Sequence, residues 1–169
     1  LDGAAMNAGQ DVQWEYAGAS AAYIEDGEYI GRILKAALKW NPVYKRDEVL
    51  FEVEMLAGPF VDGRPRWRAG QTVYDLTPGY FSAEGVVLTA HFKVDVANGR
   101  VRLGRKSKYY RALAAVFGGV VPPDPSPDIL IGQVIRCIVA TVVRDSNKDP
   151  IHDSQWYSTV RTFTGAATH

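Results

Sequence analysis

The stretch Val49-Leu50-Phe51-Glu52-Val53-Glu54-Met55 decides the fold class, because its side chains sort onto two faces with a period of two residues. One parity holds four large apolar side chains, and the other holds Glu52 and Glu54. That period is typical of a half-buried β-strand and not of a helix. The stretch therefore predicts a strand with one face against a core.

The segment before it, residues 28–40, fits either the apolar face of a helix or a strand. Asn41-Pro42 ends the element in both cases, because a proline disfavours helical backbone at the residue before it. We expect a strand, since a long strand here would pair with residues 49–55 through a turn at 41–47.

Further strands are expected along the rest of the chain. Residues 86–95 alternate in the same way, and Asn98-Gly99 is a strong hairpin signal that leads into a strand at 100–103. The same criteria predict a loop at 57–70, a short strand at 71–76, a long strand at 133–144, a turn at 145–150 and a return strand at 156–163.

One helix is expected late in the chain, with Ser107 as its N-cap and Gly118-Gly119 as its end. Tyr109 is expected to point outward, and the core face is expected to hold Tyr110, Leu113, Ala114 and Phe117. Prolines between residues 122 and 127 then predict a stiff, extended link to the last strands.

This order of elements predicts a mainly β fold: an oligonucleotide-binding (OB)-like Greek-key barrel of five to six strands with one helix before the last strands. A β-sandwich is the main alternative. We expect one barrel domain at residues 25–169, preceded by a flexible acidic arm at residues 1–24. Residues 1–10 have the composition of a loose arm or of an added tag, with Met6 as a candidate native start.

The composition is that of one globular domain, with 169 residues of which 47% are hydrophobic and 22% charged. A single cysteine, Cys137, excludes a disulfide scaffold and a structural zinc site built from several thiolates. The sequence shows no apolar run of the roughly 18 residues that cross a bilayer, and no secretory leader. We therefore expect a cytoplasmic protein that does not enter the membrane.

Catalytic and metal-binding signatures are sparse. His91, His152 and His169 are isolated in sequence, and Cys137 lies in an apolar strand where a buried side chain is expected. Glycines fall at turns and form no phosphate-binding loop. We expect no enzyme activity, no cofactor and no metal, and keep a small β-barrel enzyme acting on a nucleotide or sugar as the weakest of three hypotheses.

The two signs of charge are segregated along the chain, although 19 basic residues balance 19 acidic ones. Residues 1–30 carry six acids and no base, whereas residues 57–117 carry ten bases and four acids. A local excess of bases can steer a polyanion toward the protein. The alternative is that the acidic arm folds against the basic stretch and cancels its charge.

Aromatic side chains are interleaved with these bases, which is typical of proteins that hold single-stranded nucleic acid: cations follow the backbone and rings stack on bases. Bases at a helix N-terminus also oppose the helix dipole, so a polyanion explains those near Ser107 better than helix stability does. The run 100–111 fits a solvated edge as well. Trp67 is expected to be exposed, and Trp40 fits an exposed ring or a core residue equally. The candidate residues are Lys39, Trp40, Tyr44, Lys45, Arg46, Arg64, Arg66, Trp67, Arg68, Lys93, Arg100, Arg102, Arg105, Lys106, Lys108 and Tyr109.

Several segments together resemble a known group of proteins. They are residues 29–33 after Asp26-Gly27, then 49–54, 106–113 before a proline-rich break, 132–139 and 156–160. In this order, across residues 25–163, the chain resembles the OB-fold single-stranded DNA-binding proteins of phages, plasmids and mobile elements. The resemblance implies coating of single strands in replication, recombination or transfer, with DNA favoured over RNA and no cofactor.

The same resemblance implies self-association into a homo-oligomer and contacts with replication or recombination proteins. Many relatives recruit partners through an acidic C-terminal tail, but residues 161–169 contain no acid, so that role is not carried over. The alternative function is a non-enzymatic structural or protein-interaction β-barrel of a phage or mobile element. Nucleic-acid binding requires Trp67, Tyr109 and the arginines on one face, whereas protein interaction tolerates their dispersion.

Overall fold

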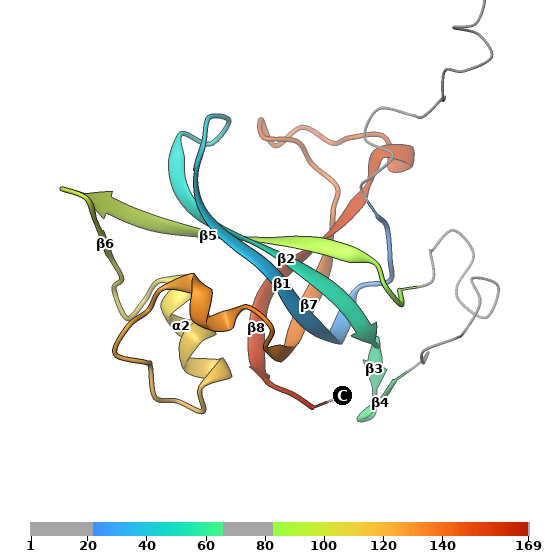
Figure 1. The fold of residues 1–169 in the computed structure, drawn as a ribbon. Helices are drawn as coiled ribbons and strands as arrows, with labels where there is room; N and C mark the ends of the chain where they lie inside the picture. The colour runs from blue at the N-terminus through green and yellow to red at the C-terminus, as the bar shows by residue number, and fades with distance from the viewer. Residues whose placement is uncertain (1–21, 66–82, 169) are drawn as a thin grey trace, which may run out of the picture.

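Five long strands form the body of the molecule in this computed structural model, which describes residues 22–65 and 83–168 (Figure 1). They are β1 (Gly27–Asn41), β2 (Arg46–Ala57), β5 (Val87–Ala97), β7 (Val134–Val142) and β8 (Tyr157–Ala166). The shorter elements are β3 (Phe60–Val61), β4 (Arg64–Pro65), β6 (Arg100–Arg102), the helix α2 (Lys108–Val116) and the 3-10 turns η2 (Pro127–Leu130) and η3 (Asp153–Gln155).

The long strands close into a barrel. Their hydrogen-bonded order is β2-β1-β7-β8-β5, and β5 pairs with β2 to complete the ring. Every pairing in it is antiparallel except that of β5 with β8, which is parallel at Ala90 and Val160. The helix lies between the third and fourth barrel strands, and β6 pairs with β5 outside the ring. The structure is thus the predicted OB-like Greek-key barrel. A β-sandwich is excluded, because its strands would form two separate sheets and not one closed ring.

The β1–β2 hairpin confirms the strand expected at residues 28–40, where the sequence fitted a helix as well as a strand. Ile33 pairs with Val53 and Leu38 with Val49, and a shift in register between Ile33 and Lys35 leaves one extra residue in β1. Such a bulge bends a strand and increases its twist, which helps a sheet to close into a barrel. Beyond the bulge the hairpin continues to its turn at residues 42–45.

Aromatic rings fill one end of the barrel. Phe51, Phe92 and Phe163 meet with ring centroids 5.2 to 5.8 Å apart, and Tyr109 of α2 lies 6.1 Å from Phe51 and 5.8 Å from Phe92. All four side chains are buried, as are the apolar residues of 49–55 that share the parity of Phe51. The helix therefore closes this end of the core.

The predicted orientation of the helix is wrong by one residue. The buried residues of α2 are Tyr109, Ala112, Leu113 and Val116, whereas Tyr110 is only partly buried. Both sets have helical spacing, and the aromatic cavity at the barrel end selects Tyr109. Its hydroxyl donates to the Pro125 carbonyl at 2.8 Å, which satisfies the polar end of a buried ring. Ser107 caps the helix as predicted, accepting from the Tyr110 N–H at 3.1 Å.

Smaller differences concern the connections. The loop predicted at 57–70 contains the short strands β3 and β4, which pair across a turn at Asp62 and Gly63. The strand predicted at 71–76 lies outside the described residues, as do residues 1–21 of the expected arm. Ile24, assigned to that arm, is buried, and its N–H donates to the Ser158 hydroxyl at 2.9 Å. No helix in the described parts of the chain is long and apolar enough to span a membrane.

Candidate nucleic-acid interface

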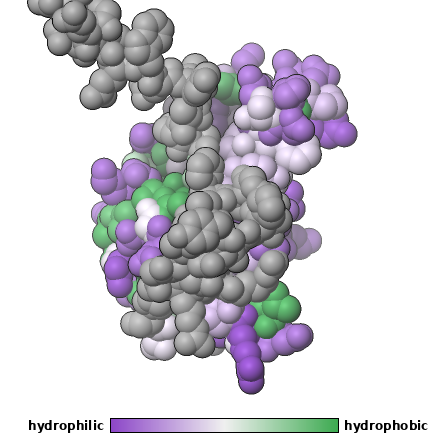
Figure 2. All heavy atoms as spheres, turned by 90° about the vertical axis from the view of Figure 1, so that its right-hand side faces the viewer, coloured by the Kyte–Doolittle hydropathy of each residue, from purple (hydrophilic) through white to green (hydrophobic). Residues whose placement is uncertain are grey.

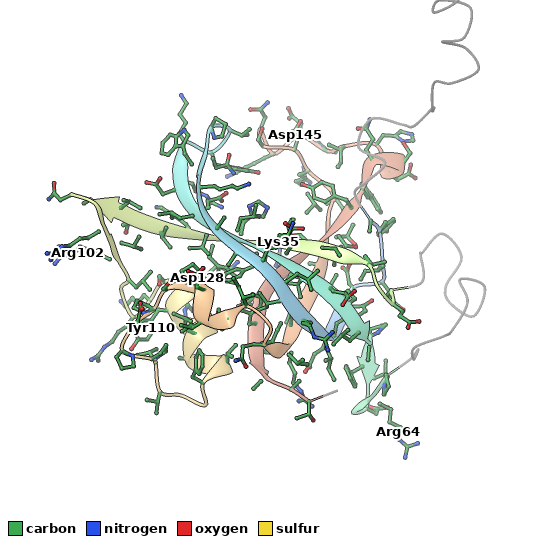
Figure 3. All side chains as sticks on the ribbon, in the orientation of Figure 1. Lys35, Arg64, Arg102, Tyr110, Asp128 and Asp145 are labelled. Atoms are coloured by element: carbon green, nitrogen blue, oxygen red, sulfur yellow. The ribbon has the colours of Figure 1, made fainter. Side chains whose placement is uncertain are left out.

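The predicted basic segments do not form one surface. Arg102 lies on β6 at the far left of Figure 3, whereas Arg64 lies on β4 at the lower right. Arg100, Arg105 and Lys106 are exposed near Arg102. Arg66, Trp67 and Arg68 fall outside the described residues. Arg64 and Arg102 therefore do not form the predicted continuous face, so a nucleic-acid surface on this barrel must be formed by other residues of the candidate set.

Tyr109 cannot serve as a stacking platform. Its ring is buried in the core, and burial together with the charges of Asp124 and Asp128 raises the pKa of its hydroxyl. A base could reach this ring only if α2 left the barrel. Tyr109 is thus a core residue, and its assignment to the binding surface is corrected.

The turn between β1 and β2 presents two aromatic rings to solvent. Trp40 is 59% exposed and Tyr44 is 55% exposed. Trp40 is therefore an exposed ring and not a core residue. Leu38 and Val43 beside them are exposed as well. In OB-folds the loop between the first two strands and the face of strands two and three are common ligand sites. The equivalent parts of this barrel are the turn at 42–45 and the strands β2 and β5.

Asn41 and Glu48 hold this turn in shape. The Asn41 side-chain oxygen accepts from the N–H groups of Val43 at 2.9 Å and Tyr44 at 3.1 Å. Its amide nitrogen donates to Glu48 at 2.8 Å, and Glu48 also accepts from Arg46 Nε at 2.6 Å and His91 Nδ1 at 3.2 Å. The turn is therefore tied to both β2 and β5 through one carboxylate.

Glu48 is buried, with 3% of its surface exposed. Burial alone would raise the pKa of this carboxyl, but hydrogen bonds from Asn41, Arg46 and His91 outweigh it and lower the pKa. Glu48 is thus a carboxylate at neutral pH and neutralises Arg46. The Arg46 guanidinium carbon lies 5.2 Å from the centre of the Tyr44 ring, a cation–π contact that supports one side of the ring.

Cations from three distant parts of the chain meet beside the turn. Burial and the nearby charges of Arg161, Arg46 and Arg111 lower the pKa of Lys108. The helix α2, which carries Lys108, packs against β8 and β5. Lys93 is exposed on β5 directly opposite Glu48 in register. We call Trp40, Tyr44, Lys45, Lys93, Lys108 and Arg161 the turn-end surface.

Few of the described cations are neutralised. Within residues 22–65 and 83–168, lysines and arginines form ion pairs with acids only at Arg32–Glu54, Arg46–Glu48 and Arg136–Glu28. Lys45, Lys93, Lys108 and Arg161 therefore keep their charges without an acidic partner among those residues. An anion approaching the turn-end surface would meet them unpaired.

Two residues near this surface were not predicted from sequence. Arg161 stands alone between Val160 and Thr162, and only the parallel pairing of β8 with β5 brings it here. Tyr157 is 38% exposed, and burial and the nearby Tyr44 hydroxyl raise the pKa of its own hydroxyl. Alternation along a strand indicates only that one of Trp156 and Tyr157 faces outward.

Groups that could support other chemistry are separated or buried. Cys137 is buried as predicted, and burial and the charge of Glu28 raise the pKa of its thiol to about 12. No three His, Cys, Asp or Glu side chains of the described chain gather as metal ligands.

Comparison of the sequence with protein-family models and with curated proteins finds no match.

Proposed function

We propose that this barrel binds single-stranded nucleic acid on the turn-end surface. The observation that carries the proposal is the position of two exposed rings, Trp40 and Tyr44, on a braced turn beside unpaired cations from β5, α2 and β8. The family resemblance of the sequence favours DNA over RNA, in replication, recombination or transfer of a phage or mobile element.

In this proposal the aromatic rings bind the bases and the cations bind the phosphates. A ring stacked on a base contributes about 1–3 kcal/mol, and cations bind the phosphates without regard to sequence. Asn41 and Glu48 hold the turn before any ligand arrives, so less conformational entropy is lost on binding. Arg46 lies against Tyr44 and contributes support for the ring more than a free charge.

The test is an anisotropy titration of a labelled thymidine oligonucleotide at about 50 mM and then 200 mM salt. Trp40→Ala and Tyr44→Ala should each weaken binding by about 5- to 150-fold, the equivalent of one lost stack. Trp40→Phe and Tyr44→Phe keep a ring and should bind nearly as well as the unaltered protein. Absence of binding by the unaltered protein at the lower salt concentration would overturn the proposal.

A second candidate function, protein interaction, is favoured by the β5–β6 ribbon. β6 is the last strand of the sheet order, so its outer edge has no partner among the described residues, and Val96 and Val101 are exposed on the ribbon. Open strand edges can pair with another chain. Concentration-dependent dimerisation that Val101→Lys abolishes, measured by sedimentation equilibrium, would support this candidate.

A further inference from the structure

A groove of about 410 Å³ runs along the outside of the barrel next to the turn-end surface. Ala37, Leu50 and Ile131 provide its apolar lining, and Lys35, Lys39 and Glu52 provide its polar groups. Lys35 lies near the centre of Figure 3, well away from both Arg64 and Arg102. Figure 2 shows that apolar surface on this molecule occurs in patches flanked by hydrophilic residues.

The register of the strands places this groove on the same face as Lys93 of the turn-end surface. Ala37 pairs with Leu50, which pairs with His91 of β5. Lys39 pairs with Glu48, which pairs with Lys93 in the row above. Since alternate residues of a strand share a face, the groove and Lys93 lie on the same outer face of the barrel.

The charges lining the groove are available to a ligand. Neither Lys35 nor Lys39 forms an ion pair with any described residue, although Glu52 and Glu48 are their partners in register. Glu48 is already engaged by Asn41, Arg46 and His91. Glu52 forms no ion pair with a described residue, and its carboxylate is only partly buried.

These groups match the parts of one nucleotide. An apolar floor can contact the flat face of a base, and lysines on the same strand can donate to the phosphates on either side of it. A carboxylate accepts a hydrogen bond from an exocyclic amino group, as from cytosine N4. Thymine has no amino group, and its one donor, N3–H, lies between two carbonyl oxygens that repel a carboxylate. An acidic peptide fits less well, because its side-chain carboxylates have no hydrogen to donate to Glu52.

We propose that this groove holds one nucleotide of the bound strand and prefers cytosine or adenine over thymine through Glu52. The inference rests on the proposed function and adds a base preference to it. Lys35 and Lys39 hold the flanking phosphates, and Lys93, on the same outer face beyond Lys39, is positioned for the next phosphate.

The test compares oligocytidine with oligothymidine of equal length by fluorescence anisotropy. The unaltered protein should bind oligocytidine about tenfold more tightly. Glu52→Gln should abolish this preference, because an amide can donate to thymine O4 as well as accept from cytosine N4. The matched control is Glu54→Gln, which alters the next acid on the same face, 3.9 Å from Arg32 and outside the groove, and should keep the preference.

The lysines supply a second readout. Lys35→Gln with Lys39→Gln should reduce the slope of log affinity against log salt by about 1.4, because each single-strand phosphate contact contributes about 0.7. Lys106→Gln with Lys148→Gln, two exposed lysines outside the groove, should leave the slope unchanged. Equal affinity for the two oligonucleotides, or equal effects of Glu52→Gln and Glu54→Gln, would overturn the inference alone. Failure of both oligonucleotides to bind would overturn the proposed function and this inference with it.

Discussion

Two basic hairpins project from this barrel, and they are built differently. The β1–β2 turn carries Trp40 and Tyr44 and is tied to β2 and β5 through the buried Glu48. The β5–β6 ribbon projects from the barrel at the left of Figure 1. It carries Arg100 and Arg102, whose side chains have no hydrogen bond or ion pair with other described residues. Both hairpins carry basic residues, but only the β1–β2 turn is held by side-chain hydrogen bonds to a buried carboxylate.

A cluster of bases is therefore not in itself a binding site. Ordering a flexible lysine or arginine on a ligand costs about 0.5–1.5 kcal/mol of conformational entropy in either hairpin, which offsets much of what an exposed charge contributes. At the turn, Asn41 and Arg46 are already fixed by Glu48 before a ligand binds. Three changes test this difference between the hairpins: loss of the Glu48 carboxylate, removal of charges from either hairpin, and a lower pH.

The largest effect is expected from Glu48→Ala. Removing this carboxylate leaves Asn41, Arg46 and His91 without their common acceptor, and hydrogen bonds to a charged group contribute about 1.5–3 kcal/mol each. Since Arg46 and His91 can reach water in the variant, we expect a loss of about 2–3 kcal/mol in the free energy of unfolding, measured with urea. Glu54→Ala removes a more exposed acid with one long ion pair and should cost under about 0.5 kcal/mol. Equal losses in the two variants would contradict the bracing role of Glu48.

Much of the fold could be predicted from local patterns. The strand at 49–55, the hairpin at Asn98-Gly99 and the Ser107 cap each depend on neighbours in sequence, and each is present in the structure. The orientation of α2 could not be predicted, because Tyr109 and Tyr110 are chemically alike and both fit a helical face. The choice between them depends on a cavity formed by Phe51, Phe92 and other residues distant in sequence.

The candidate site was predicted in part, and for a similar reason. The turn residues Trp40 and Tyr44 were found because bases and rings adjoin in sequence. The run 100–111 was treated as one surface because it is continuous, yet it spans a strand, a turn and a helix that point different ways. Arg161 was missed because a single arginine gives no local signal, and the pairing of β8 with β5 joins residues about 70 positions apart.

An intermediate effect is expected when two positive charges are removed from one hairpin or from the other. Lys45→Gln with Lys93→Gln removes two unpaired cations of the turn-end surface and should lower the salt slope of oligonucleotide binding by about 1.4. Arg100→Gln with Arg102→Gln removes the same charge from the ribbon and should change the slope by less than about 0.5. Titrations at several salt concentrations measure both slopes. A larger change in the ribbon variant would place the nucleic acid on β6 and reverse the comparison.

The smallest effect is a difference in acid response. Hydrogen bonds make the folded-state pKa of Glu48 lower than its ordinary value of 4.5, so the unfolded chain takes up this proton first as the pH falls. The stabilisation is therefore fully present above pH 4.5 and is lost as the pH falls through the folded-state pKa. Urea unfolding of the Glu48→Gln variant should lack this contribution, so its deficit in stability relative to the unaltered protein should shrink in acid. Arg100→Gln with Arg102→Gln leaves Glu48 and its partners in place, so this variant should keep the acid response of the unaltered protein. A Glu48→Gln deficit that stays constant down to pH 3 would mean that the carboxylate charge does not brace the turn, and the two hairpins would then differ only in their aromatic residues.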